Sequence, residues 1–380
     1  MRGFLLLFTA ACLLFSTSCG TSVGFSDNYR AIEELLLVHT IGFDSHPEGL
    51  ECSVVGGEHE NQGILRLSAP GKTISDAYRL LQNFSGKEEL YYAHTRYVLV
   101  GEEYAQEGVE SVMNYLESSA QLRSDLPMFV VKDGTAKKLL MQAGGKERSI
   151  YEVMEAVVRE CTVSGNGYPF TCGDIAVYSA EYGSALICAL SADSTMEINP
   201  SAEKDELTPV LSGYGVLKEG KLVGYLSTDA AKGVSLLMDE LGTGDITILS
   251  DGRPISLRLT DVHTTLVPAF GPAGTVTGLT VELEVAAALE EAEQKHKLDL
   301  QQVSQQLETD LQQWVNHVLM TMSNTGTDFL GFGRQIAIRY PDRWAQNQND
   351  WLTRIKTLPM QAEVQCSVSM GENEQRRISS

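Results

Sequence analysis

Residues 215–222 come within one position of a phosphate-binding loop, the motif in which a Gly-rich turn and a lysine hold nucleotide phosphates. The stretch reads Gly-Val-Leu-Lys-Glu-Gly-Lys-Leu, so Leu222 stands where a hydroxyl would hold magnesium. The pattern that follows predicts a strand, whereas the motif needs a helix whose N-terminus faces the phosphate. We therefore interpret residues 215–222 as part of a β-hairpin.

Two further motifs match by their letters only. Residues 20–24, Gly-Thr-Ser-Val-Gly, spell a hydrolase nucleophile pattern but lie in a Gly/Ser/Thr-rich stretch that cannot build its strained elbow. His59-Glu60 begins like a zinc-protease helix, yet Gly63 occupies the place of the second histidine. His94 precedes a strand and could be a base, although a structural role is more common for such a histidine. We expect no catalytic residue, no metal ligand and no cofactor, and hence a protein that is not an enzyme.

Cys19 has the sequence context of a lipid attachment site. A short positive start is followed by an apolar run, residues 4–15, which is too short to span a bilayer and is typical of a signal peptide. Small residues 16–18 then lead directly to Cys19-Gly20. We predict that residues 1–18 are a lipoprotein signal peptide and that Cys19 carries acyl chains, each buried methylene contributing about 0.8 kcal/mol. Cleavage before Cys12, or ordinary secretion after cleavage near Ser18, are the alternatives.

The cysteines after Cys19 do not form a disulfide framework. They are odd in number and irregular in spacing, at Cys52, Cys161, Cys172, Cys188 and Cys366. Cys161 and Cys172 flank a Gly-rich segment and could pair outside the cell. Cys366 alternates with valines and is interpreted as a small core residue.

The chain is strongly acidic. It carries 50 Asp and Glu against 29 Lys and Arg, a formal net charge of −21. Such a surface repels phosphate backbones and anionic headgroups, so we expect no nucleic-acid partner, and we expect the lipid rather than a basic patch to hold the membrane. No later stretch approaches 18 consecutive apolar residues.

Two regions with domain-like patterning follow a Gly/Ser/Thr-rich tether at residues 19–28. In residues 29–200, apolar strand patterns at 35–44, 97–100 and 128–131 alternate with amphipathic helix patterns that begin at Thr73, Ala105, Thr135 and Ile150. This alternation predicts an α/β to α+β N-terminal domain, and its division into two subdomains stays open. The polar, acidic stretch from Ser191 to Thr208 is the expected domain boundary.

The second region, residues 208–372, is predicted to be a strand-rich sheet with one long helix. A hairpin spans residues 214–226, strands of alternating polarity are expected around 255–259 and 279–285, and residues 361–370 alternate strictly. The longest helix is expected from about Glu290 to Met322, packed on the domain's own sheet, with a coiled-coil partner as the alternative. Residues 373–380 are expected to be a disordered tail. The whole chain is thus predicted to be multi-domain, with mixed sheets flanked by helices.

An aromatic and Gly-rich stretch after the long helix stands out. Trp344 and Trp351 lie on one helical stripe with Ile355, and Pro341 suits a first helical turn. Such a stripe is more often core than ligand cage, and exposure of Phe332 or Trp344 would instead indicate a protein interface. The residues of this structural or interface signature are Asp328, Phe329, Gly331, Phe332, Gly333, Trp344 and Trp351.

Five segments, in this order, resemble the Ger(x)C family of spore germination lipoproteins, the C subunits of nutrient germinant receptors. The resemblance runs from Cys19 to Gly371 and departs from the family in the extra cysteines, in Ser16 and in the unmatched stretch from Cys161 to Cys188. The matching segments are Tyr29–Leu35 after Cys19, Ile41-Gly42-Phe43-Asp44, Tyr91–Glu102, Gly220–Leu226, and Asp328–Gly333 with Pro341, Trp344 and Trp351.

The resemblance implies a non-enzymatic receptor subunit, with residues 29–200 and 208–372 as the family's N-terminal and C-terminal domains. It implies a diacylglycerol anchor on the outer face of the spore inner membrane. It also implies two integral-membrane partners, the A and B subunits, one of them transporter-like, in a complex that senses nutrients. The runner-up is a solute-binding lipoprotein of a transport system, which would need two similar lobes around a cleft, whereas the two halves here differ in pattern.

Overall fold

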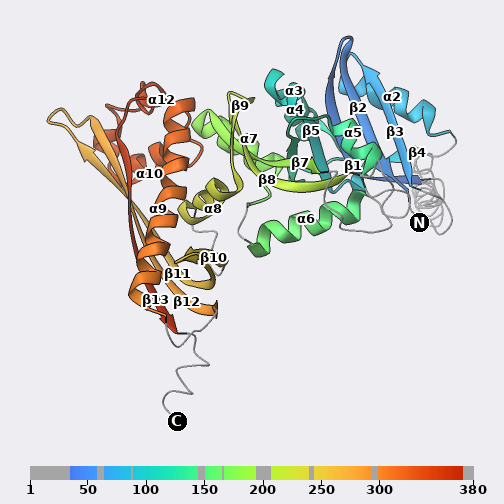
Figure 1. Cartoon of the computed structure of the whole chain (residues 1–380). Helices are drawn as coiled ribbons and strands as arrows, with labels where there is room; N and C mark the ends of the chain where they lie inside the picture. The colour runs from blue at the N-terminus through green and yellow to red at the C-terminus, as the bar shows by residue number, and fades with distance from the viewer. Residues whose placement is uncertain are drawn as a thin grey trace, which may run out of the picture.

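Two structural units lie side by side in the computed structural model (Figure 1). The structure describes residues 35–57, 64–86, 89–143, 150–164, 167–193, 207–238, 244–292 and 298–370. The predicted signal peptide, Cys19, the tether and the C-terminal tail therefore lie outside the described residues.

The first unit is built on a mixed sheet with a parallel centre. The order is β3-β2-β1-β5-β6-β7-β8-β9, and β4 pairs with β1 beside this path. β1, β5, β6 and β7 run parallel, and their short apolar runs are buried on both faces, as parallel strands usually are. The strand bounds are β1(Leu35–His46), β2(Gly49–Gly56), β3(Leu65–Gly71), β4(Glu89–Tyr91), β5(Tyr97–Gly101), β6(Met128–Val131) and β7(Ser184–Asp193).

Helices with side-chain caps connect these strands. The side chains of Thr73, Thr135 and Thr171 each accept a hydrogen bond from the backbone N–H three residues further on. At Thr171 the Asp174 carboxylate also accepts from the Thr171 backbone N–H, which completes a capping box. The amphipathic segment expected as one helix from Ala105 is divided in two, because Gly108 (φ 138°) ends the first. The bounds are α2(Ile74–Phe84), η2(Tyr92–His94), α3(Glu102–Glu107), α4(Glu110–Ser118), α5(Ala136–Gln142), α6(Ile150–Ser164) and α7(Cys172–Tyr182).

The predicted hairpin is present but belongs to the first sheet. β8(Thr208–Lys218) pairs antiparallel with β7 and with β9(Lys221–Leu226). The strands on either side of the acidic stretch 194–206 are thus neighbours in one sheet. The domain prediction grouped residues 208–226 with the second region, and their pairing with the first sheet was not foreseen, because backbone pairing across a polar connection leaves no local sequence signal.

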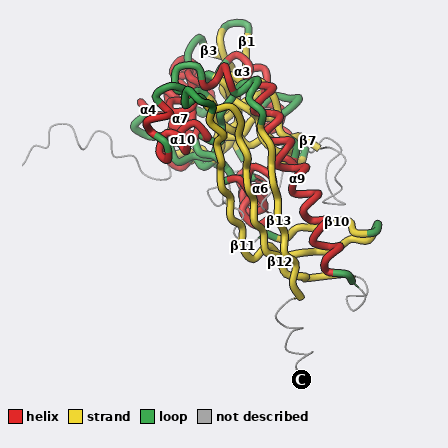
Figure 2. Tube along the Cα trace, turned by 90° about the vertical axis from the view of Figure 1, so that its left-hand side faces the viewer, coloured by secondary structure: helices red, strands yellow, loops and turns green. Residues whose placement is uncertain are grey.

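The second unit is a four-stranded sheet with a long helix along it. The strand order is β10-β11-β12-β13, antiparallel except for the parallel pair β12–β13, which α9 connects. Figure 2 shows the long strands β11, β12 and β13 side by side with α9 next to β13. The bounds are β10(Asp245–Ser250), β11(Arg253–Phe270), β12(Val276–Ala292), β13(Met360–Met370), α8(Thr228–Leu237) and α9(Leu300–Thr325).

Helix α9 covers the edge of this sheet through a polar stripe. Ser304 accepts from the Val368 N–H (3.1 Å) and donates to the Cys366 carbonyl (3.1 Å). One and two turns further on, Glu308 accepts from the Cys366 N–H (3.0 Å) and Gln312 donates to the Ala362 carbonyl (2.9 Å). The helix thus packs on its own unit's sheet, as predicted. It begins at Leu300 rather than near Glu290, because residues up to Ala292 belong to β12.

The fold class is confirmed: a mixed α/β protein with two sheets flanked by helices, in which the C-terminal sheet carries one long helix.

Candidate functional site

The signature residues form a buried corner between α9 and the short helices that follow it. We call residues 326–333 together with Trp344 and Trp351 the Asp328 corner. Gly326 ends α9 in the left-handed conformation (φ 64°), and α10(Phe332–Arg339) begins after Gly331. α11(Pro341–Trp344), with Pro341 in its first turn as predicted, and α12(Trp351–Arg354) then turn back toward Asp328.

The Asp328 carboxylate joins the two ends of this corner. One oxygen accepts from the Phe332 N–H (2.8 Å); the other accepts from the Gly333 N–H (2.7 Å) and from the Trp351 indole Nε1–H (2.7 Å). The carboxylate therefore supplies partners for the otherwise unpaired N–H groups at the start of α10, where its charge also suits the helix dipole. Asp328 is 2 % exposed.

Burial dominates the acidity of this carboxyl group. Removal from water raises the pKa of Asp328 to about 6, and the hydrogen bonds from Gly333, Trp351 and Phe332 offset only part of that rise. The group stays mainly ionised at neutral pH and titrates in a mildly acidic range.

Glycines allow the aromatic rings to close over the corner. A Cβ at Gly333 would lie 2.7 Å from Trp344 Cη2 and 2.8 Å from Trp351 Nε1, and Gly331 has a φ of 67° that favours glycine. The two indoles meet edge to face with centroids 5.3 Å apart. They come from two short helices, not from the single helix that their spacing predicted. Phe332 is buried and Trp344 half-buried, so the corner is mainly structural.

The corner is fastened to the first unit. The Asp328 N–H donates to Ser184 Oγ (3.1 Å) at the start of β7, and Lys218 at the end of β8 donates to the carbonyls of Thr325 (3.1 Å) and Gly326 (3.0 Å). Arg334 of α10 pairs with Glu181 of α7 at 2.6 Å. The signature therefore fixes how the two units sit against each other.

A hollow of about 520 Å³ lies at this junction. Its wall includes Tyr182, Asp328 and Trp344, together with the Arg334–Glu181 ion pair. Asp328 accepts from Trp351, Arg334 donates to Glu181 and Tyr182, and the lining contains no histidine, serine or cysteine. Among the described residues no cluster of His, Cys, Asp and Glu has the arrangement of a metal site.

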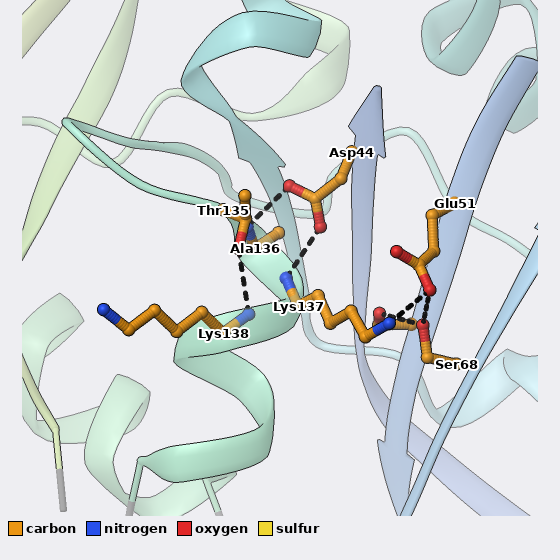
Figure 3. A network of polar contacts seen from close by, with 8 residues as sticks. Asp44, Glu51, Ser68, Thr135, Ala136, Lys137 and Lys138 are labelled. Carbon is orange, nitrogen blue, oxygen red and sulfur yellow. Dashed lines mark hydrogen bonds and ion pairs between the residues drawn. The ribbon is translucent and has the colours of Figure 1, made fainter. Parts of the chain in front are cut away.

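A second buried carboxylate, Asp44, likewise accepts hydrogen bonds from the start of a helix, here in the first unit (Figure 3). It lies at the end of the Ile41–Asp44 segment in β1 and accepts from the N–H groups of Ala136 and Lys137, both at 2.7 Å, at the start of α5. At the other end of α5, Arg66 donates to the carbonyls of Leu140 and Ala143, both at 3.2 Å. Opposite charges thus complement both ends of one helix dipole.

A network of side chains continues from α5 to the antiparallel strands (Figure 3). Lys137 Nζ contacts Glu51 at 2.5 Å, and Ser68 donates to the same Glu51 oxygen at 2.8 Å. Burial raises the pKa of Asp44. Burial also works to raise the pKa of Glu51, but hydrogen bonds from Lys137 and Ser68 outweigh it and hold that pKa below its usual value. The network fixes α5 on the sheet and offers no open site.

The cysteines among the described residues are free thiols in the structure, where the suggested Cys161–Cys172 disulfide is not formed. Cys161 on α6 instead faces Cys188 on β7, and Cys188 donates to the Tyr168 carbonyl at 3.0 Å. Cys172 lies at the start of α7, where burial raises the pKa of its thiol to about 12. Cys366 is half-buried in β13.

Sequence reasoning identified the corner but missed its partners. Ser184 and Lys218 are separated from the corner by more than a hundred positions; Ser184 belongs to no motif, and Lys218 was noted only as part of the predicted hairpin. Asp44 was noted only as part of a segment, and a carboxylate directly after the apolar residues 41–43 of a strand was the available signal. No helix among the residues that the structure describes is long and apolar enough to cross a membrane.

The fold and the fastened corner define a class: two-unit mixed α/β proteins in which the signature residues hold the units together. Comparison with known families makes the class specific. The model "Spore germination protein N-terminal domain" matches residues 28–192, and "Spore germination B3/ GerAC like, C-terminal" matches residues 212–370. The chain belongs to the Ger(x)C family of spore germination proteins.

Individual relatives agree with this assignment. The chain is similar to spore germination protein B3 of Bacillus subtilis (strain 168), with 24% identity over 79% of this chain and 78% of the relative. It is similar to spore germination protein KC of the same organism, with 21% identity over 85% of this chain and 86% of the relative. The crystal structure of the GerBC protein has a similar fold (TM-score 0.57, 18% identity, covering 86% of this chain and 96% of that one). The names of these relatives give no support to a transport role.

Proposed function

We propose that this protein is a non-catalytic, lipid-anchored subunit of a spore germinant receptor, required for nutrient-triggered germination. The observation that carries the proposal is the pair of germination-domain matches, in order, along one chain. The Asp328 corner supports it, because the residues that resemble the family signature hold the two units together and leave no catalytic arrangement in the hollow beside them.

The anchor follows from the first residues of the sequence. Acylation of Cys19 would place the folded part on the outer face of the spore inner membrane. Because a net charge of −21 repels anionic headgroups, the acyl chains rather than a basic surface would provide the attachment. The proposed partners are the integral-membrane A and B subunits of the receptor. The protein then acts as a rigid extracytoplasmic body, because direct hydrogen bonds and an ion pair fix one unit against the other.

The alternative of a solute-binding lipoprotein is less well supported. Such a protein closes two similar lobes around its ligand, whereas here one unit has a parallel-centred sheet and the other a four-stranded, mainly antiparallel one. The junction is also bonded directly, through Ser184 and Lys218.

Deletion of the gene in the spore-forming host tests the proposal. Germination is followed as the loss of optical density after single nutrients are added to dormant spores, with vegetative growth as the control. The proposal predicts loss of at least one nutrient response and its recovery on re-expression. Full germination on every nutrient, in a strain that lacks homologous subunits, would rule it out.

A further inference from the structure

A groove separate from the Asp328 corner opens between α4 and α7 of the first unit. The turn between β8 and β9 closes one end of it, and its volume is about 750 Å³. The Val109 N–H donates to the Gly220 carbonyl at 2.9 Å, so this turn is fixed to the residue that precedes α4. We call this feature the α4–α7 groove.

The floor of the groove is apolar. Val109 and Leu116 from the α4 side and Ile175 from α7 are buried beneath it. Val177, which lines the groove on α7, is 53 % exposed. Apolar surface that is contiguous across a groove in this way is typical of sites that contact a partner.

Small residues on α7 leave space for another helix. Ala176 and Ala180 line the groove four residues apart, which places them on one stripe of the helix, and both are exposed. Small residues on such a stripe let a second helix approach closely, and a groove between two helices accepts an apolar helix face. The shape therefore suits a helix better than an extended strand.

The rim of the groove is acidic. Glu110 and Glu117 on α4 and Glu219 in the β8–β9 turn line it, and the lining contains no Lys or Arg. Two basic residues that adjoin lining residues in the sequence stand outside the lining: Lys221 follows Gly220, and Arg123 precedes Ser124 and is paired with Asp125 at 2.9 Å. An occupant with Lys or Arg beside its apolar face would complement this rim.

Helix α7 also connects the groove with the junction between the units. Its central residues line the groove, and its last two, Glu181 and Tyr182, contact Arg334 of α10, next to the Asp328 corner (2.6 Å and 3.3 Å). Docking on α7 would therefore occur next to the contact that holds the two units.

We propose that the α4–α7 groove binds an amphipathic helix with Lys or Arg beside its apolar face, contributed by an integral-membrane subunit of the receptor. The proposal rests on the proposed function and deepens it by naming the docking surface and the chemistry of the partner segment.

Co-purification from the host tests the groove. The full lipidated chain carries an affinity tag and is expressed with both membrane subunits, and their recovery in detergent is measured. Two double variants change the groove. Ala176→Trp with Ala180→Trp fills it with indole rings, and Glu110→Lys with Glu117→Lys reverses the charge of its rim. Matched controls on the outer face of the second sheet are Val267→Trp, and Glu282→Lys with Glu284→Lys, at positions that are likewise exposed.

The groove variants should lower recovery of the membrane subunits at least tenfold, while the controls behave like the wild type. A photo-crosslinking residue at Val177, which leaves the rest of the groove native, should form an adduct with a membrane subunit, and one at Val267 should not. Recovery at the wild-type level by both groove variants would overturn the proposal. The proposal would also be overturned if the groove variants recovered the membrane subunits normally but lost germination. That outcome would indicate that the groove binds a small cationic ligand instead.

Failure of the broader proposal would look different. A wild-type chain that neither recovers the membrane subunits nor supports nutrient germination would remove the receptor function itself. If the wild-type chain recovers the membrane subunits and supports nutrient germination, and the groove variants do the same, only the proposal about the groove is rejected.

Discussion

Asp328 and Trp351 are joined by a hydrogen bond of 2.7 Å from the indole Nε1–H to a carboxylate that is itself fully buried. The bond closes the loop that contains α10 and α11, and the same carboxylate holds the first turn of α10. One ionised side chain thus fixes three segments next to the junction between the units.

Trp351→Phe should destabilise the protein by about 1–3 kcal/mol, because it leaves a buried carboxylate oxygen with one donor fewer. Trp344→Phe is the matched control: it removes the other indole of the same pair, which has no bond to Asp328, and should cost less. Urea unfolding of the lipid-free chain measures both. Equal losses for the two variants would mean that the indole–carboxylate bond contributes nothing beyond ring packing.

Stability should fall between mildly acidic and neutral pH because of Asp328. Its pKa is raised from 3.8 to about 6 in the folded state, so below 3.8 the group is protonated whether the chain is folded or unfolded. Between those values the folded state retains a proton that the unfolded state releases, and above 6 this stabilisation is lost. At about 1.4 kcal/mol per pH unit, the contribution amounts to at most about 3 kcal/mol.

Asp328→Asn separates this effect from other titrations, Asp44 included, whose pKa is also raised by burial. The free energy of unfolding of wild type minus that of the variant should decrease from pH 4.5 to pH 7.5. A difference that is constant with pH would show that Asp328 does not titrate in this range.

Gly333→Ala should destabilise the Asp328 corner by about 1–3 kcal/mol, since its Cβ would overlap both tryptophan rings. Gly278→Ala serves as the control, because its Cβ would meet nothing closer than 3.6 Å. Thermal unfolding distinguishes the two. A tolerated Gly333→Ala would mean that the rings can move apart without cost and that the corner is not tightly packed.

Glu308→Ala should lower stability by about 1 kcal/mol and promote aggregation, because it exposes the Cys366 N–H on the edge strand β13. Gln305→Ala, on the exposed side of the same helix, should have little effect. Urea unfolding and light scattering at elevated concentration give the two measurements. If both variants behave alike, α9 does not protect this edge through its side chains.

Local patterns predicted most of the individual elements. The buried runs at Tyr97–Gly101 and Met128–Val131, the helix starts at Thr73 and Thr135, and the alternating strand before Met370 all follow from residues near in sequence. Non-local pairing decided the exceptions. Residues 286–291 are Ala, Leu and Glu, good helix formers, yet they form a strand because β11 and β13 pair with them on both sides.

The site was predictable as a set of residues but not as an arrangement. Asp328, Gly331, Gly333, Trp344 and Trp351 were singled out from their types and spacing, and the structure brings all of them together. Their attachment to Ser184 could not be foreseen, because that hydrogen bond spans 144 positions. The pairing of β8 with β7 was not foreseen either, because the polar stretch between these two strands was interpreted as a domain boundary.

The central claim, a germination subunit held at the membrane by its first mature residue, is tested most directly at Cys19. Mass spectrometry of the N-terminus, on protein isolated from the spore-forming host, compares wild type with Cys19→Ala, and membrane fractionation and nutrient germination are followed in parallel. The account predicts a diacylglyceryl-modified Cys19 in the wild type, and in the variant release from the membrane with loss of the nutrient response. An unmodified N-terminus that begins elsewhere, or normal germination by a released Cys19→Ala protein, would contradict it.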